Sequence, residues 1–282
     1  MKKRTAKKVF QILSLAIGVA ILFIFLLFAI APKAFAPCDP KHSYDAFLGI
    51  SGEHILGTNN LGYDIFSELV YATRSTLLAG LLAALISLVT GTLIGLLSGY
   101  AKGVVGEAMN GVINFFLLIP MLPLAIVIGA YLDGGFMDIV LTISLIGWCS
   151  TARAVRAKTI KLKSSPFIKI MRGLGYSRAR ILFCHILPNV LDVAAAKFIT
   201  TVASCILLEA TLGFLGVGSN VELSWGVMIN YAYRFGGLAR GAYNWLLAPG
   251  VCITLLELAF YFIGSFAEGR LSVVKGGRSV LE

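Results

Sequence analysis

The residues that could carry out chemistry in this chain are few and scattered. The three histidines, His42, His54 and His185, lie far apart in unlike contexts, and none accompanies a recognisable nucleophile. The five cysteines form no CxxC pair and show no zinc-finger spacing. The chain also lacks the glycine-rich loop that binds the phosphates of ATP. We therefore predict no catalytic residue, no bound cofactor and no metal site.

Charged residues inside apolar runs are the other functional candidates, because a charge is costly in a bilayer and usually faces a bundle interior or a wet cavity. Glu209, Lys197 and Glu257 are such residues. Lys197 and Glu209 cannot pair, since 12 residues of helix separate them by about 18 Å. Glu209 either lines a translocation path or orders the bundle through an interhelical ion pair or hydrogen bond. We take Glu209, Phe214 and Glu257 as candidate pathway residues.

The segment Arg153–Arg180 holds nine basic residues and no acidic one. Within it, Ser165 suits the N-cap of a helix, Pro166 its first position and Gly175 its end. The pattern predicts a short helix over Pro166–Leu174 with one apolar face. That face consists of Phe167, Ile170, Met171 and Leu174. Such a helix either lies on an anionic membrane surface or docks into a groove on a partner protein.

The composition excludes a water-soluble globular protein. Hydrophobic residues make up 58% of the 282 residues and charged residues 13%, whereas soluble domains carry about 25% charged residues. A spanning helix needs about 20 mostly apolar residues. The apolar segments therefore predict an all-α integral membrane protein with six transmembrane helices. Their approximate bounds are 9–31, 75–101, 108–132, 135–155, 187–215 and 244–266.

The basic residues are unevenly divided between the two sides of the membrane. If the N-terminus is cytoplasmic, 18 Lys and Arg face the cytoplasm and five lie in the opposite loops. The positive-inside rule therefore places both termini in the cytoplasm, and the net charge of +10 needs no nucleic acid partner. The expected parts are a tail and first helix (1–31), an extracytoplasmic segment (32–74), a core of five helices (75–270) with a loop at 153–185, and a cytoplasmic tail (271–282).

Small and helix-breaking residues shape two of the predicted spans. Gly91, Gly95 and Gly99 recur every four residues, so they share one helix face and let another backbone approach closely. Pro120 and Pro123 each remove a backbone donor, and each is expected to bend the third span. Before the second span, Asp64–Tyr71 is expected to form an interfacial helix.

The loop after the fourth span resembles a signature of binding-protein-dependent ABC importer permeases. In that signature a Glu-Ala-Ala triplet is followed by a Gly and later by a hydrophobic residue, Leu and Pro. Gly175 and Ile186-Leu187-Pro188 match its later positions. The triplet itself is Lys169-Ile170-Met171, so a base stands where the family has an acid.

Two further motifs resemble the dipeptide, oligopeptide and nickel branch of this family. His54–Thr58, with Gly62 and Asp64, is similar to the branch's entry motif. The segments Glu209–Gly218 and Ser224–Gly226 are similar to its fifth helix and the loop that follows. The resemblance covers about residues 30–270. The entry motif departs from the family at Asn59 and Tyr63, where Asp and Arg are usual.

The resemblance implies a type I (MetI-like) ABC importer permease fold with a cytoplasmic coupling helix, in the plasma or inner membrane of a prokaryote. The chain would form half of a pathway for dipeptides or oligopeptides, or alternatively for nickel or metal chelates. The implied partners are a homologous second permease, two ABC ATPases that bind ATP and Mg²⁺, an extracytoplasmic solute-binding protein and the lipid bilayer. The implied ATPase-coupling residues lie in the loop 164–185 and are Phe167, Lys169, Ile170, Met171, Arg172, Gly173, Leu174 and Gly175.

A secondary transporter driven by an ion gradient is the alternative from a different class. Such proteins show an internal inverted repeat and several charges near the membrane midplane. The chain shows no convincing repeat. The permease is therefore favoured over the secondary transporter.

Overall fold

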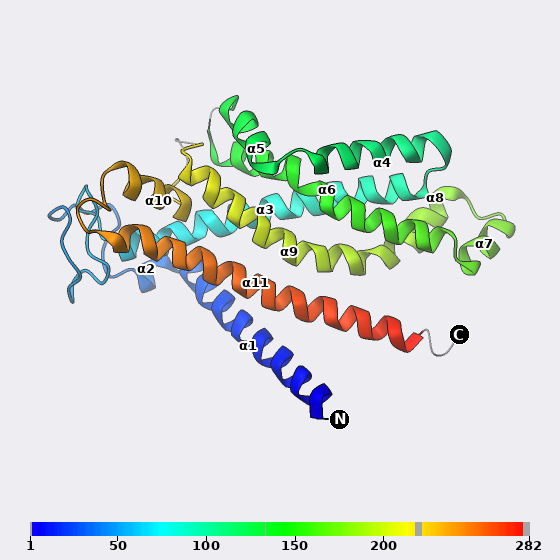
Figure 1. Cartoon of the computed structure of the whole chain (residues 1–282), viewed down its shortest axis with the longest axis horizontal. Helices are drawn as coiled ribbons and strands as arrows, with labels where there is room; N and C mark the ends of the chain where they lie inside the picture. The colour runs from blue at the N-terminus through cyan, green and yellow to red at the C-terminus, as the bar shows by residue number, and fades with distance from the viewer. Residues whose placement is uncertain (1, 133, 218–221, 279–282) are drawn as a thin grey trace.

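The computed structural model describes residues 2–132, 134–217 and 222–278, with side chains between residues 11 and 267 of those ranges, and its elements are helical (Figure 1). In chain order they are α1 (Lys2–Ile30), α2 (Pro32–Phe35), α3 (Ile65–Tyr100), α4 (Gly103–Leu118), α5 (Met121–Ala130), α6 (Phe136–Lys163), α7 (Pro166–Gly173), α8 (Arg178–Arg180), the π-helix η1 (Ile181–Ile186), α9 (Leu187–Phe214), α10 (Trp225–Arg234) and α11 (Tyr243–Arg278). In the described ranges no strand forms beyond one isolated bridge between Thr58 and Asp64.

The long helices account for the predicted membrane spans. Five of them, α1, α3, α6, α9 and α11, contain stretches long and apolar enough to cross a bilayer. The pair α4 and α5 passes the same test together but is bent by 89° at its break. The described chain therefore contains five such helices, or six spans if the bent pair counts as one. The prediction of an all-helical membrane protein is confirmed.

The third predicted span is broken rather than continuous. The break falls at Ile119 and Pro120, where both residues adopt extended ψ angles of 129° and 123°. Pro123 lies in the first turn of α5. Backbone N–H groups in a first turn have no intrahelical acceptor, so this proline removes no helical hydrogen bond. The expectation that each proline bends the helix is therefore wrong for Pro123, which sits in regular helix.

The second span starts ten residues earlier than predicted. Asp64 is the N-cap of α3, and its Oδ2 accepts a hydrogen bond from the Ser67 backbone N–H at 2.8 Å. Glu68 adds an acidic residue to the first turn, where the helix dipole favours negative charge. The segment Asp64–Tyr71 is consequently the beginning of α3, and the separate interfacial helix expected there does not form.

The glycines of α3 form a seam with α6. A Cβ atom built on Gly91 would lie 2.5 Å from the Trp148 carbonyl oxygen, and one on Gly95 equally close to that of Ala152. At Gly99 it would lie 2.7 Å from the Thr159 Cβ. Real Cβ atoms do not approach other atoms so closely, so only glycine permits this contact between the two helices. The predicted close helix packing is confirmed.

Three buried clusters hold the bundle together. The largest includes Trp225 and Trp245 and joins α1, α3, α5, α6, α9, α10 and α11. A smaller cluster joins α3, α6, α7, η1 and α9 around Leu96, Val155 and Val190. The third joins α4 to α6. Figure 1 shows that α1 begins and α11 ends on the half of the molecule that holds α7.

Candidate coupling surface and polar cavity

The short helix α7 forms where the sequence predicts it, over Pro166–Gly173. Ser165 occupies the N-cap position, but its side chain makes no capping hydrogen bond. At the other end Gly175 takes a positive φ of 80° and donates to the Arg172 carbonyl, while the Tyr176 N–H bonds to the Met171 carbonyl at 3.2 Å. These two bonds make a Schellman turn, which is a usual reason for glycine after a helix. The predicted stop at Gly175 is confirmed.

The apolar residues of α7 divide between two faces. Ile168 and Met171 are buried, at 2% and 6% exposure, in the smaller cluster that α7 shares with α3, α6 and α9. Three others protrude from the protein, with 58%, 61% and 71% of their surface exposed. These residues are Phe167, Ile170 and Leu174. The sequence placed Met171 on the same face as these three, but in the structure it points into the bundle.

The basic residues around α7 also differ in direction. The Arg172 guanidinium lies over the Tyr100 ring at 5.6 Å, and the Lys163 ammonium lies over the same ring at 5.8 Å. Lys163 also donates to the carbonyls of Gly99 and Ala101 at the end of α3. The Arg172 contact fastens α7 to α3, and the Lys163 contacts fasten the end of α6 to α3. Lys169 is exposed instead, beside the protruding apolar side chains.

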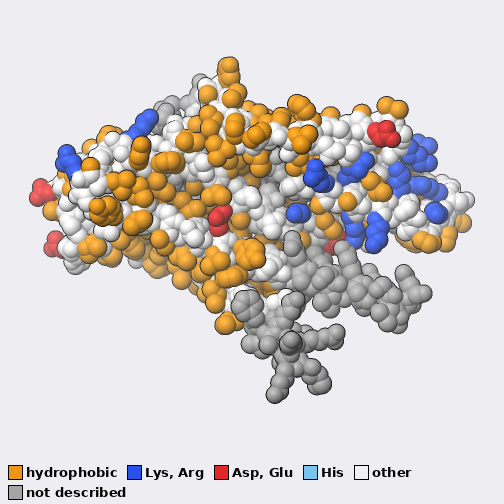
Figure 2. Space-filling model, viewed as in Figure 1, with side chains coloured by type: hydrophobic (Ala, Val, Ile, Leu, Met, Phe, Trp, Pro, Cys, Tyr) orange, Lys and Arg blue, Asp and Glu red, His pale blue; other side chains and the backbone are white. Residues whose placement is uncertain are grey.

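The end of the bundle that holds α7 is strongly basic. In Figure 2 the Lys and Arg side chains gather there, with hydrophobic side chains beside them. We call the three protruding residues Phe167, Ile170 and Leu174 the α7 ridge. An apolar ridge surrounded by cations suits a groove on another protein that has an acidic rim. The same chemistry also suits an anionic lipid surface.

A mostly apolar cavity of about 300 Å³ lies between α5, α6 and α9, away from α7, with several polar side chains in its wall. Its hydroxyl-bearing and charged residues are Ser150, Lys197, Thr200, Thr201 and Ser204, and its other lining residues are Met121, Ile143, Gly147, Cys205 and Leu208. Lys197 lies ten residues, or about 15 Å, from the start of the 28-residue helix α9. Among the described residues, no carboxylate forms an ion pair with its ammonium group.

None of the three predicted pathway residues lines this cavity. A pattern in the sequence could have predicted the polar side chains that α9 contributes to this cavity. Polar residues recur in α9 at positions i, i+3, i+4 and i+7 from Lys197, so they share one face of an otherwise apolar helix. The charge of Lys197 was noted in the sequence, but its place on this polar face was not predicted.

Glu209 lies instead at the contact between α9 and α10. It is 2% exposed and lies beside the side chain of Ser224, the N-cap of α10, and its Oε2 atom has no hydrogen-bond partner among the described residues. Gly226 in the first turn of α10 rests on the backbone of Ala210. This position between α9 and α10 fits the bundle-ordering interpretation of Glu209, and both interpretations stay predictions.

The residues after Ser224 extend this contact to α3. The Trp225 backbone N–H donates to the Thr76 hydroxyl and its indole N–H to the Leu69 carbonyl, both at 3.1 Å. Phe214 ends α9 with 36% of its surface exposed, and its carbonyl accepts from the Asn230 side chain. Glu257 is half-buried on α11. Gly218, the last glycine of the fifth-helix motif, lies outside the described residues.

Comparison with known proteins identifies the family. A family described as "Binding-protein-dependent transport system inner membrane component" matches residues 91–273. The chain is 34% identical over 255 residues to a dipeptide transport system permease protein, DppC, of Alkalihalophilus pseudofirmus, which covers 88% of this chain and 82% of the relative. It is 32% identical to a glutathione transport system permease protein, GsiD, of Pectobacterium atrosepticum, over 86% of this chain and 82% of the relative.

Two further similarities agree with this result. An oligopeptide transport system permease protein, OppC, of Bacillus subtilis is 31% identical over 85% of this chain and 79% of the relative. A chain of the MetNI methionine ABC transporter in an inward-facing conformation superposes with a TM-score of 0.55 at 19% identity, over 71% of this chain and 96% of that chain. The latter similarity concerns the fold alone and confirms the predicted type I importer permease fold. The chain is a transport component rather than an enzyme, and it belongs to the family of binding-protein-dependent transport system inner membrane components.

Proposed function

We propose that this chain is one permease half of an ATP-driven importer of short peptides. The similar permeases are named for dipeptide, glutathione and oligopeptide transport, and glutathione is itself a short peptide. A homologous second permease would complete the pathway, and an external solute-binding protein would deliver the peptide. ATP and Mg²⁺ would be bound by two separate ATPase subunits.

The basic end of the bundle would face the cytoplasm. Lys and Arg concentrate on the cytoplasmic side of membrane proteins, and here they gather around α7. Both termini would then be cytoplasmic, because α1 begins and α11 ends on that half of the molecule. The outer loop and α10 lie at the opposite end, where a binding protein would approach.

The α7 ridge is the observation that carries the proposed coupling to an ATPase. One face of α7 is buried in the cluster that joins α3, α6 and α9, and Arg172 stacks on Tyr100. The other face protrudes with three large apolar side chains. A helix held in this way can receive a displacement from a partner and pass it to the spans. The exposed Lys169 favours an acidic residue on the rim of the partner's groove.

The cavity between α5, α6 and α9 is the proposed part of the pathway. Its hydroxyl groups and the Lys197 ammonium offer polar contacts at the depth where lipid-facing surfaces are apolar. A peptide always carries a carboxylate at its C-terminus, and Lys197 would pair with it during passage. The second permease would close the open side of this cavity.

Replacing Ile170 with Asp tests the coupling proposal. Ile170 is 61% exposed, so the substitution leaves the permease core unchanged. In the docked complex the new carboxylate would be buried without a partner. We expect peptide-stimulated ATP hydrolysis by the complete complex in proteoliposomes to fall at least about tenfold, which corresponds to about 1.4 kcal/mol of lost interaction.

The matched control is Val104→Asp. Val104 is 81% exposed near the same end of the bundle, but it lies on α4 and outside the α7 ridge. It should retain stimulated hydrolysis. Equal activity of the Ile170→Asp and Val104→Asp complexes would show that the ridge does not dock on the ATPase.

A further inference from the structure

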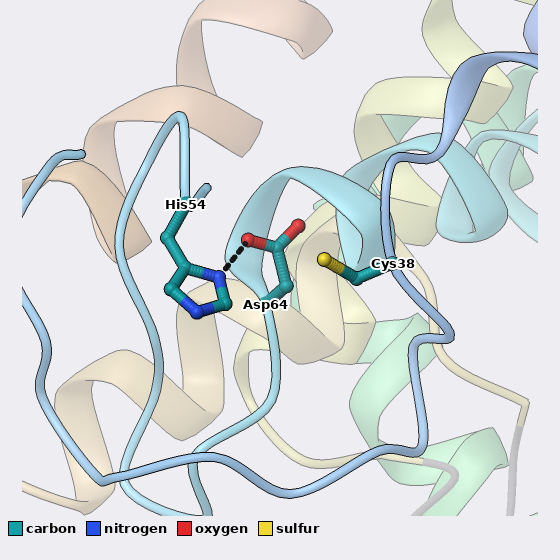
Figure 3. Close-up of side chains that lie close together, drawn as sticks. All are labelled: Cys38, His54 and Asp64. Carbon is teal, nitrogen blue, oxygen red and sulfur yellow. Dashed lines mark hydrogen bonds and ion pairs between the residues drawn. The ribbon is translucent and has the colours of Figure 1, made fainter. Parts of the chain in front are cut away.

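Three side chains with metal-binding groups meet in the outer loop region, far from α7 and from the cavity that Lys197 lines. Cys38 follows α2, His54 lies in the loop, and Asp64 is the N-cap of α3 (Figure 3). One thiol sulfur, one imidazole nitrogen and one carboxylate oxygen all lie within 4.8 Å of one another. No metal site was predicted from the sequence, because these residues belong to three separate parts of the chain, which only the fold brings together.

The surrounding hydrogen bonds hold two of the groups in place. His54 Nδ1 lies 3.0 Å from Asp64 Oδ1, and the two residues are 3% and 0% exposed. The other carboxylate oxygen of Asp64 accepts from the Ser67 N–H. The Ser67 hydroxyl in turn accepts from the Cys38 backbone N–H at 3.1 Å. Ser67 thus fixes the carboxylate and the backbone of the cysteine in the same place.

A tyrosine adds a second layer around the cluster. The Tyr44 ring packs edge-on against the His54 ring with centroids 4.6 Å apart. This ring contact limits the orientations open to the imidazole, as outer-shell contacts of metal ligands do.

The donor set matches the preference of Zn²⁺. This ion binds thiolate, imidazole and carboxylate, with bonds of about 2.0–2.3 Å, and in non-structural sites it keeps a fourth position for water. Ligand atoms around a tetrahedral ion with such bonds are about 3.3–3.6 Å apart. The His54–Asp64 distance of 3.0 Å is already close to that value, and Cys38 is only partly buried, so its thiol can approach without opening the fold.

We propose that Cys38, His54 and Asp64 bind one divalent cation of the Zn²⁺ class, with water as the fourth ligand. Binding releases the thiol proton to solvent, and the imidazole proton shared with Asp64 moves from Nδ1 to Nε2, so that Nδ1 can face the ion. The ion ties the start of the outer loop, the loop itself and the first turn of α3 into one unit. This proposal does not depend on peptide transport.

Cobalt binding to the purified full-length chain tests the proposal. Co²⁺ takes the place of Zn²⁺ and gives a thiolate charge-transfer absorption when a cysteine is a ligand. We expect one Co²⁺ per chain with this absorption, and its loss when Zn²⁺ is added. Cys38→Ser should remove the absorption and lower the affinity for Zn²⁺ at least about tenfold, since a hydroxyl is a much weaker ligand than a thiolate.

Cys184→Ser is the matched control, because Cys184 is also accessible but belongs to no such cluster in the described chain. It should retain the full absorption. No thiolate absorption in the unaltered chain, or the same absorption in Cys38→Ser, would overturn the proposal.

Alkylation of Cys38 in the unaltered chain gives a second test that needs no substitution. In sealed cells, a membrane-impermeant maleimide should react with Cys38 after treatment with a chelator. Addition of Zn²⁺ should reduce the rate at least about tenfold, because a metal-bound thiolate is a poor nucleophile. Equal rates with and without Zn²⁺ would show that Cys38 is not a ligand. Replacement of Zn²⁺ by Mg²⁺ should give no protection, since Mg²⁺ prefers oxygen ligands.

Discussion

Lys197 is a positive charge near the middle of a spanning helix, with no carboxylate paired to it among the described residues. An unpaired ammonium at this depth is costly, and here it lines a cavity together with four hydroxyl-bearing residues. Thr200 and Thr201 both donate their hydroxyl protons to the Lys197 carbonyl, at 3.0 and 2.8 Å.

Replacing Lys197 with Met should impair transport more than ATP hydrolysis. Methionine keeps the length of the side chain but removes the charge that would pair with a peptide carboxylate. We expect peptide uptake into proteoliposomes to fall at least about tenfold, while Lys197→Arg retains most of it. Uptake by Lys197→Met at the unaltered rate would exclude the carboxylate contact.

The roles of single residues were the hardest features of this structure to predict from the sequence. Glu209 stood out in the sequence as an acid within an apolar run, but whether it lines a cavity depends on the position of α10, which no local pattern reveals. Asn59 stands where the family's entry motif usually has Asp. In the structure its side-chain amide donates to Glu68 at 2.9 Å, which a carboxylate could not do. The role of each residue is set by a partner distant in the chain.

The short helix α7 was predictable because its signals are local. A proline at the first turn, an apolar period and a glycine with positive φ act within ten residues. The division of its apolar residues between a buried and an exposed face was not predictable, because it depends on where α3 and α9 pass. The break between α4 and α5 lies at Pro120, as a proline there predicts. The sequence could not show that Pro123 lies in the first turn of α5, where a proline does not disturb the helix.

The seam between α3 and α6 should not tolerate even a methyl group. A Cβ on Gly95 would lie 2.5 Å from a backbone oxygen of α6, so Gly95→Ala must separate the two helices. Overpacking of this kind costs about 1–3 kcal/mol. We expect a lower midpoint of thermal unfolding for the purified protein in detergent.

Gly111→Ala serves as the comparison for this seam. Gly111 lies on α4, and a Cβ atom added there would meet nothing within 4 Å, so alanine should leave the midpoint unchanged or raise it. Equal midpoints for Gly95→Ala and Gly111→Ala would contradict the tight contact between α3 and α6.

The molecule as a whole is polarised along its long axis. Its basic residues lie at the α7 end, and the loop with Cys38, His54 and Asp64 lies at the other. Composition and charge predicted the gathering of basic residues at one end. Every spanning segment in a bilayer must be apolar, and Lys and Arg concentrate in the loops on one side. The packing order of the helices needed the structure, since the apolar faces of the six segments are chemically alike.

Labelling by an impermeant maleimide checks the orientation of the whole chain. Ile50 is 67% exposed in the outer loop, and Cys184 is exposed near α7. In a Cys38→Ser background, we expect Ile50→Cys to react in intact cells. Cys184 should react only in inside-out vesicles stripped of ATPases. Labelling of Cys184 in intact cells would reverse the proposed orientation.

The seam of Gly91, Gly95 and Gly99 leaves α3 and α6 no room to slide past each other. In the proposed coupling, a displacement at α7 would therefore move α3 and α6 together rather than one along the other. The 89° break at Pro120 would let α5 change its angle to α4, because no continuous helix crosses it. The cavity shared by Met121 on α5 and Ser150 on α6 would then change width during transport.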